Sequence, residues 1–245
     1  MLSVTDLVKR YFDRPVLRGI TFALRPGEVV ALVGANGAGK STLIKSILGL
    51  TGIEGGQVSI GPDAVGPGSM EARRIVAYVP EQPMLYNDLT AWEHLRYVAM
   101  VHGLPQERFN QRAEWLLRSL RLWEDRHLDP LRMSKGMRQK VSLAAGMLTS
   151  PGILLLDEPF SGLDPLAARS LRDLILAVKH EGTAVLMSTH MLDSAERISD
   201  RFLLLFEGRL VGDGPADQLR TQAGVAPSAP MDDVFAELCA RRVEP

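Results

Sequence analysis

The feature that most constrains this chain is a glycine-rich segment, residues 34–41, which reads Gly-Ala-Asn-Gly-Ala-Gly-Lys-Ser. It follows the apolar run 29–33, typical of a buried parallel strand, and precedes a helix expected from Lys40 to about Leu50. Glycines permit a tight turn whose backbone N–H groups surround phosphate, and the helix N-terminus adds partial positive charge. The pattern predicts a phosphate-binding loop, with Lys40 on the β- and γ-phosphates and the Ser41 hydroxyl as an Mg²⁺ ligand.

Two adjacent carboxylates form the second candidate group. Asp157 and Glu158 directly follow four apolar residues, 153–156, which are expected to form a buried strand. Such a pair alone is more often a helix cap. Because it follows the phosphate loop in the chain, however, we interpret Asp157 as holding Mg²⁺ through water and Glu158 as orienting or deprotonating the attacking water.

Strands and helices alternate along most of the chain, and this predicts an α/β fold with a mainly parallel sheet. With the phosphate loop and the acidic pair, the core resembles that of a P-loop NTPase (RecA-like). An antiparallel β part is expected at the N-terminus, and Arg74–Val79 is a further expected strand. Thr90 and Asp164 are expected helix caps. The predicted organisation is one ATPase domain, 1–222, with a core of 1–83 and 151–222, a helical subdomain at 84–150, a surface loop near 61–68, and a linker with a short C-terminal helix at 223–245.

Composition narrows the classes of partner. The formal net charge is −1, so no charge field is built for nucleic-acid phosphates, and we expect no nucleic-acid partner. No run approaches the ~20 apolar residues of a membrane-spanning helix. The single cysteine, Cys239, excludes an internal disulfide.

A third motif, Met133-Ser134-Lys135-Gly136-Met137, precedes the acidic strand, and here the sequence resembles the ABC ATPase family. The resemblance covers about residues 1–220 and looks closest to bacterial ABC-2 or Ecs-type exporters. Glycine and glutamine are commonest in the family where Lys135 and Met137 stand, but the Ser134 hydroxyl and the Gly136 N–H suffice for a phosphate clamp. The other family motifs follow in order, at Tyr11, Gln82, Asp164 and His190.

The resemblance implies that ATP and Mg²⁺ are the cofactors and gives each motif a role. Tyr11 would stack on adenine, and His190 would hydrogen-bond the γ-phosphate. Gln82 would touch Mg²⁺ and water and relay the nucleotide state, although it also fits a surface loop amide. The remaining implied nucleotide contacts are Gly34, Ala35, Asn36, Gly37, Ala38, Gly39, Lys40, Ser41, Thr42, Ser134, Lys135, Gly136, Met137 and Asp164.

The resemblance also implies two protein partners. A second ATPase subunit, the same or different, would face this one head to tail, each phosphate loop opposite the other's Ser134 and Gly136. A separately encoded transmembrane permease would hold the pair at the cytoplasmic face of the membrane, where export is favoured but the cargo stays open. A soluble ABC ATPase acting on DNA or ribosomes is the competing class, and the chain has no room for the coiled-coil insertion or second domain of such proteins. A binding module with a dead site is the third, disfavoured because all the catalytic residue types are present.

Two apolar segments have less specific interpretations. Met84, Leu85 and Tyr86 either pack within the subdomain or line a groove for a helix of the membrane partner. The segment Met231–Arg242 is expected to form a helix that packs on its own core through Val234, Phe235 and Leu238.

Overall fold

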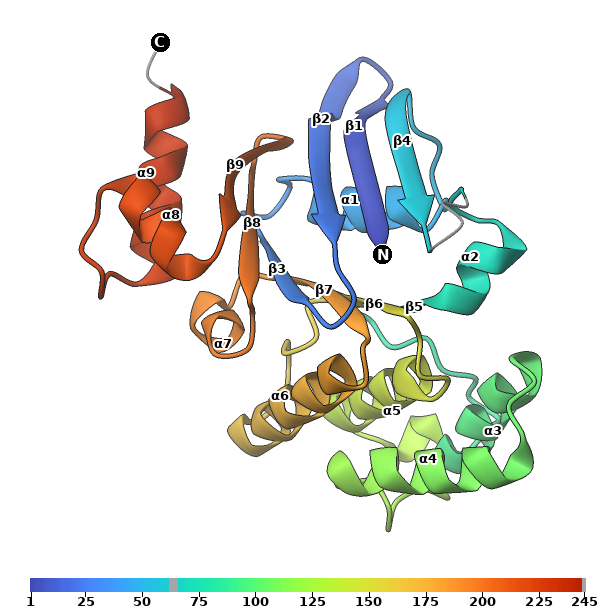
Figure 1. Ribbon diagram of the computed structural model, residues 1–245. Coiled ribbons are helices and arrows are strands. Elements are labelled where there is room, and N and C mark those ends of the chain that lie inside the picture. Colours follow the sequence, from blue (N-terminus) through green and yellow to red (C-terminus); the bar gives the residue numbers. More distant parts are fainter. Residues whose placement is uncertain (62–65, 244–245) are drawn as a thin grey trace.

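The computed structural model describes residues 1–61 and 66–243 and contains two sheets (Figure 1). The larger sheet has six strands in the order β5-β6-β7-β3-β8-β9, and every pairing is parallel except that of β8 with β9. The predicted α/β fold with a mainly parallel sheet is confirmed. The strands are β3 (Val29–Val33), β5 (Val76–Val79), β6 (Ile153–Asp157), β7 (Ala184–Thr189), β8 (Arg201–Phe206) and β9 (Arg209–Gly214).

A smaller antiparallel sheet, in the order β2-β1-β4, covers α1 (Figure 1). Its strands are β1 (Leu2–Tyr11), β2 (Arg14–Leu24) and β4 (Gly55–Ile60), and α1 runs from Lys40 to Ile47. Leu43 and Ile44 of α1 are fully buried in the apolar cluster between the two sheets. This packing holds the start of α1 against the end of β3.

The other face of the large sheet carries helices, and their caps follow the local sequence. Thr90 and Glu93 form a reciprocal capping box at α3, and Asp164 accepts hydrogen bonds from Leu166 and Ala167 at α6. Both caps were predicted. The helices are α3 (Ala91–Val101), α4 (Gln106–Ser119), the 3₁₀ turn η1 (Pro130–Arg132), α5 (Lys135–Met147), α6 (Pro165–His180) and α7 (Leu192–Glu196), with α3, α4 and α5 gathered at one end of the molecule (Figure 1).

Four elements depart from the sequence-based expectation. Helix α2 (Met70–Ile75) occupies the start of the strand predicted from Arg74, because Ser69 caps it and directs 70–75 into a helix. Strands β4 and β9 and helix α8 (Ala216–Ala223) were not predicted at all. Residues 62–65 of the expected surface loop lie outside the described residues.

The C-terminal helix α9 (Met231–Val243) forms as predicted and packs on the core. Met231 and Val234 are fully buried, and Leu238 nearly so. Arg241 also donates a hydrogen bond of 2.8 Å to the carbonyl oxygen of Gln222 at the end of α8. None of the helices within 1–61 and 66–243 has the length and apolar character needed to cross a bilayer.

Candidate functional site

The glycine-rich loop joins the buried end of β3 to the first turn of α1. Gly39 precedes α1 with φ of 112°, a conformation that side chains rarely adopt. A Cβ on Gly34 would lie 2.5 Å from the carbonyl oxygen of Leu205, so only glycine fits beside β8. No side chain caps α1, and its first turn contains no acidic residue. The loop therefore presents the uncapped N–H groups of a helix N-terminus, which suit an anion.

Lys40 is the buried cation of this loop. Its ammonium donates a hydrogen bond of 2.6 Å to the carbonyl oxygen of Gly34 and lies 3.9 Å from a carboxylate oxygen of Glu158. A buried charge requires such partners, because leaving it unpaired away from water is costly. The lysine is thus held where loop, helix and acidic strand meet.

The two carboxylates lie where the strand β6 ends, and β7 supports both. Ser188 of β7 donates its hydroxyl to the Asp157 carboxylate and accepts a hydrogen bond of 3.1 Å from the Glu158 N–H. Glu158 has φ of 48°, which turns its side chain out of the strand direction. The Ser188 contact was missed in the sequence, because β6 and β7 are 30 residues apart in the chain and become neighbours only in the sheet.

His190 lies beside Glu158 at the end of β7. Its Nδ1 atom and a Glu158 carboxylate oxygen are 2.8 Å apart, and its backbone N–H donates to the same oxygen at 3.3 Å. The carboxylate is nearly buried, whereas 62% of the histidine side chain is exposed. This pair joins a candidate base to a group that can orient it, the arrangement expected for activating a water molecule.

A cavity of about 300 Å³ brings most of these groups together. Glu81 lines this cavity, whereas the predicted ligand Gln82 does not, although both residues are exposed. Glu81 was missed because nothing local distinguishes it from Gln82. The lining residues are Val16, Ala35, Asn36, Gly37, Gly39, Lys40, Ser41, Thr42, Glu81, Asp157, Glu158 and His190.

A second cavity, of about 920 Å³, adjoins the first and shares Val16 and residues 35–37 with it. Tyr11 lies there at the end of β1, with the Lys9 ammonium 5.0 Å from its ring centre. Phe12, which the sequence analysis did not single out, also lines it and is fully exposed. An aromatic cavity continuous with a phosphate site fits a nucleoside, because bases stack on such rings.

The signature residues do not reach this site. None of 134–137 lines either cavity; instead Ser134 is the N-cap of α5, and its hydroxyl accepts a hydrogen bond of 3.2 Å from the Met137 N–H. They lie beside the turn before α6, where a Cβ on Gly136 would be 3.5 Å from the Gly162 carbonyl oxygen. Asp164 is exposed there, and its hydrogen bonds from Ala167 and Leu166 lower the pKa of its carboxyl. One chain therefore carries two separate groups of predicted nucleotide contacts.

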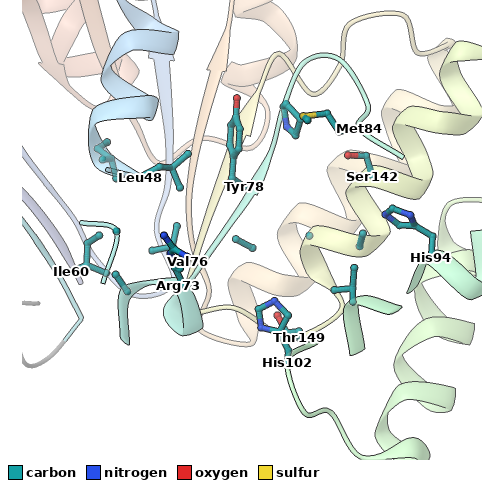
Figure 2. Close-up of a pocket in the computed structure, with 18 residues that line it drawn as sticks. Leu48, Ile60, Arg73, Val76, Tyr78, Met84, His94, His102, Ser142 and Thr149 are labelled. Carbon is teal, nitrogen blue, oxygen red and sulfur yellow. The ribbon is translucent and has the colours of Figure 1, made fainter. Parts of the chain in front are cut away.

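A third cavity, of about 410 Å³, lies between the core and the three-helix end, and Figure 2 shows its lining. It runs from Leu48 and Arg73 on one side to Met84 and His94 on the other. Burial lowers the pKa of His94, whose ring lies 5.9 Å from that of Tyr86. We call this cavity the lateral groove. Its lining contains Arg73, His94 and His102 and, within the described part of the chain, no Asp or Glu.

Comparisons with known proteins agree with this geometry. A family model described as ABC transporter matches residues 17–161, more than half of the chain. The chain is 40% identical over 238 residues to the ABC-type transporter ATP-binding protein EcsA of Bacillus subtilis (strain 168), covering 97% of this chain and 96% of the relative. It is 32% identical to the Nod factor export ATP-binding protein I of Ralstonia nicotianae, covering 90% and 69%.

Solved structures agree as well. A structure titled ATP binding subunit of ABC transporter superposes with a TM-score of 0.91 and 42% identity, covering 97% of this chain and 99% of that one. CbiO1 from Clostridium perfringens, described as part of the ABC transporter complex cbiONQ, gives a TM-score of 0.78 and 25% identity, covering 90% of each chain. The chain belongs to the ABC transporter family, as an ATP-binding subunit, and the resemblance predicted from its motifs is confirmed.

Proposed function

We propose that this chain hydrolyses ATP at the interface between two ATPase subunits and thereby powers export through a separate transmembrane permease. The separation of the two groups of contacts is the observation that supports it. The phosphate loop and acidic pair share one cavity, whereas Ser134 and Gly136 lie at another surface of the same chain. Two copies arranged head to tail would complete each site, and ATP would become part of the interface.

Within each site, residues of this chain have separate roles. The loop N–H groups and Lys40 bind the phosphates, Tyr11 stacks on the base, and Glu158 accepts a proton from the attacking water. His190, hydrogen-bonded to Glu158 through Nδ1, holds that carboxylate in position and directs its other nitrogen to the γ-phosphate.

Magnesium fits the donors present. The Ser41 hydroxyl and the Asp157 carboxylate lie in one cavity beside the phosphate loop, and Mg²⁺ favours oxygen donors, taking one or two carboxylates together with substrate phosphates. When bound, the cation neutralises charge on the phosphates. Asp157, oriented by the Ser188 hydroxyl, and Ser41 would hold it.

The lateral groove is the proposed docking site for the permease. Its apolar lining continues onto exposed Met84 and Tyr86, and its charged lining residue is Arg73. These features suit an apolar helix that carries an acidic residue. In the segment 78–84, Tyr78, Pro80 and Met84 line this groove and Glu81 lines the phosphate cavity, so docking and nucleotide state would be communicated through one short segment.

The experiment that tests the proposal is an ATP-dependent change in oligomeric state. The Glu158→Gln variant should bind ATP without turning it over and form a dimer by light scattering, because nucleotide supplies interface contacts. The matched control is Glu158→Gln with Lys40→Ala, which should stay monomeric with ATP because the phosphate loop no longer binds it. A Glu158→Gln protein that binds ATP and stays monomeric, alone and with its permease, would contradict the interfacial site.

A further inference from the structure

One buried arginine joins the two C-terminal helices to α7. Arg220 of α8, whose side chain is 11% exposed, donates a hydrogen bond from Nη2 to the carboxylate of Glu196, the last residue of α7. Its Nε atom donates to the carbonyl oxygen of Ala229, just before α9, at 2.9 Å. Asp217 is a further acceptor, but its carboxylate is 96% exposed, so this ion pair adds little. One guanidinium therefore ties α7 to the C-terminal helices, and α9 packs against both α7 and α8 (Figure 1).

Helix α7 is in turn attached closely to His190. Only Met191 separates the histidine from the helix, and the Met191 N–H donates a hydrogen bond of 2.9 Å to the Thr189 hydroxyl at the end of β7. The backbone N–H and the Nδ1 atom of His190 both contact the same carboxylate oxygen of Glu158. Because the connection is this short, a shift of α7 must also move the histidine relative to that carboxylate.

The α7 helix depends on tertiary contacts for its orientation. It has five residues, and a helix of that length is not stable by itself in water. Leu192, Ala195 and Ile198 are buried and hold this segment against the core, but apolar burial is not directional. The charged hydrogen bond between Arg220 and Glu196 is directional, so it can fix the rotation of α7 as burial alone cannot.

We propose that Arg220 is a positioning residue for ATP hydrolysis, because it holds α7 through Glu196 and thereby keeps His190 in contact with Glu158. This inference rests on the proposed function and adds to it a role for the C-terminal helices. The phosphate loop is held separately, by β3 and α1. Loss of Arg220 should therefore lower kcat and leave the KM for ATP nearly unchanged.

A second buried arginine provides the matched control. Arg201, whose side chain is 18% exposed, also donates to two carboxylates and one backbone carbonyl. These acceptors belong to Glu28, Asp213 and Ala23. Arg201 pairs with Val30 near the start of β3, whereas the phosphate loop follows the end of that strand. Its removal should thus cost stability without moving His190.

The test combines steady-state ATPase kinetics with nuclear magnetic resonance of the histidine rings. Arg220→Met should lower kcat about tenfold, as expected when a catalytic group is misplaced from a distance, with KM within about twofold of wild type. The ¹⁵N signal of His190 Nδ1, assigned with His190→Gln, should move towards its position in Glu158→Ala, because the hydrogen bond is weakened. Arg201→Met should lower the thermal midpoint while kcat and the His190 signal stay as in wild type.

A milder variant covers the case in which Arg220→Met does not fold. Glu196→Ala removes the acceptor on α7 and leaves Arg220 bonded to the Ala229 carbonyl oxygen. It should lower kcat and shift the His190 signal in the same direction as Arg220→Met. Wild-type kcat in the folded Glu196→Ala protein would overturn the proposal.

The remaining outcomes are equally decisive. A wild-type kcat or an unchanged His190 signal in folded Arg220→Met would overturn the positioning role. An equal loss of kcat in Arg201→Met would reduce the effect to general stability and would overturn it as well. Absence of ATP hydrolysis by the wild-type protein, alone and with its permease, would instead overturn the proposed function, which separates the two failures.

Discussion

The two groups of predicted nucleotide contacts differ in how the chain holds them. On the phosphate side, Lys40, Asp157 and Glu158 are buried and joined through Ser188, a backbone carbonyl and an ion pair. On the signature side, Ser134 and Lys135 are exposed, and within the described part of the chain the Ser134 hydroxyl accepts a hydrogen bond only from its own helix.

In the proposed interfacial site, this difference indicates which half is organised within one chain. Buried charges must be paired as the protein folds, so the phosphate side is organised before any ligand binds. An exposed helix N-terminus is satisfied by water and can exchange that water for an anion without rearrangement. The signature side is therefore suited to a nucleotide presented by another molecule.

The largest expected effect on activity is that of a substitution on the phosphate side. Glu158→Gln keeps the shape of the side chain and removes the base, so ATP turnover by the purified protein should fall by ~10²-fold or more. ATP affinity should be nearly unchanged, because the phosphate loop is intact. Near-normal turnover would show that another residue positions the water.

A mixing experiment tests whether the signature side acts on another chain. Ser134→Arg should block the interface and Lys40→Ala should disable the phosphate loop, so each variant alone should be inactive. In a mixed dimer, one site contains both lesions and the other contains neither. Random mixing in equal amounts should then restore roughly a quarter of the sites, and ATPase activity measures the recovery.

Two alternatives give other results. If Ser134 only caps its own helix, it contributes ~1 kcal/mol of stability and nothing to chemistry, so the folded Ser134→Arg variant should keep ATPase activity by itself. If Ser134 serves the phosphate loop of its own chain, every site in the mixture keeps one lesion and the mixture stays inactive. Because two sites that must fire together would also prevent turnover, nucleotide trapping at the single intact site should be measured in parallel. Absence of both turnover and trapping would contradict action in trans.

The smallest expected effect is on stability and concerns Asp164, on the signature side. Its hydrogen bonds from Ala167 and Leu166 lower the pKa of the carboxyl below its unfolded value. The charge therefore stabilises the fold above the unfolded pKa, which is about 4, and this contribution is lost as the pH falls through the folded pKa. Denaturant midpoints of wild type and Asp164→Asn should differ slightly at pH 7 and converge at low pH, and a pH-independent difference would contradict this.

Local motifs explain why much of the fold and site was predictable. The phosphate loop, the acidic pair and the caps at Thr90 and Asp164 each depend on residues within a few positions, so their spacing reveals them. Strand β4, which contains two glycines, and the short helix α2 were not predicted. Pairing with β1 accounts for β4, and the Ser69 cap accounts for α2.

The sequence by itself predicted a phosphate-binding loop at 34–41, because the geometry of this loop follows from its own glycines and the helix after it. Only the tertiary structure showed that Glu81, and not Gln82, lines the phosphate cavity and that Ser188 supports Asp157. The direction of a loop side chain and the contacts between strands 30 residues apart depend on packing across the sheet. The residues adjacent to a position in the sequence do not specify that packing.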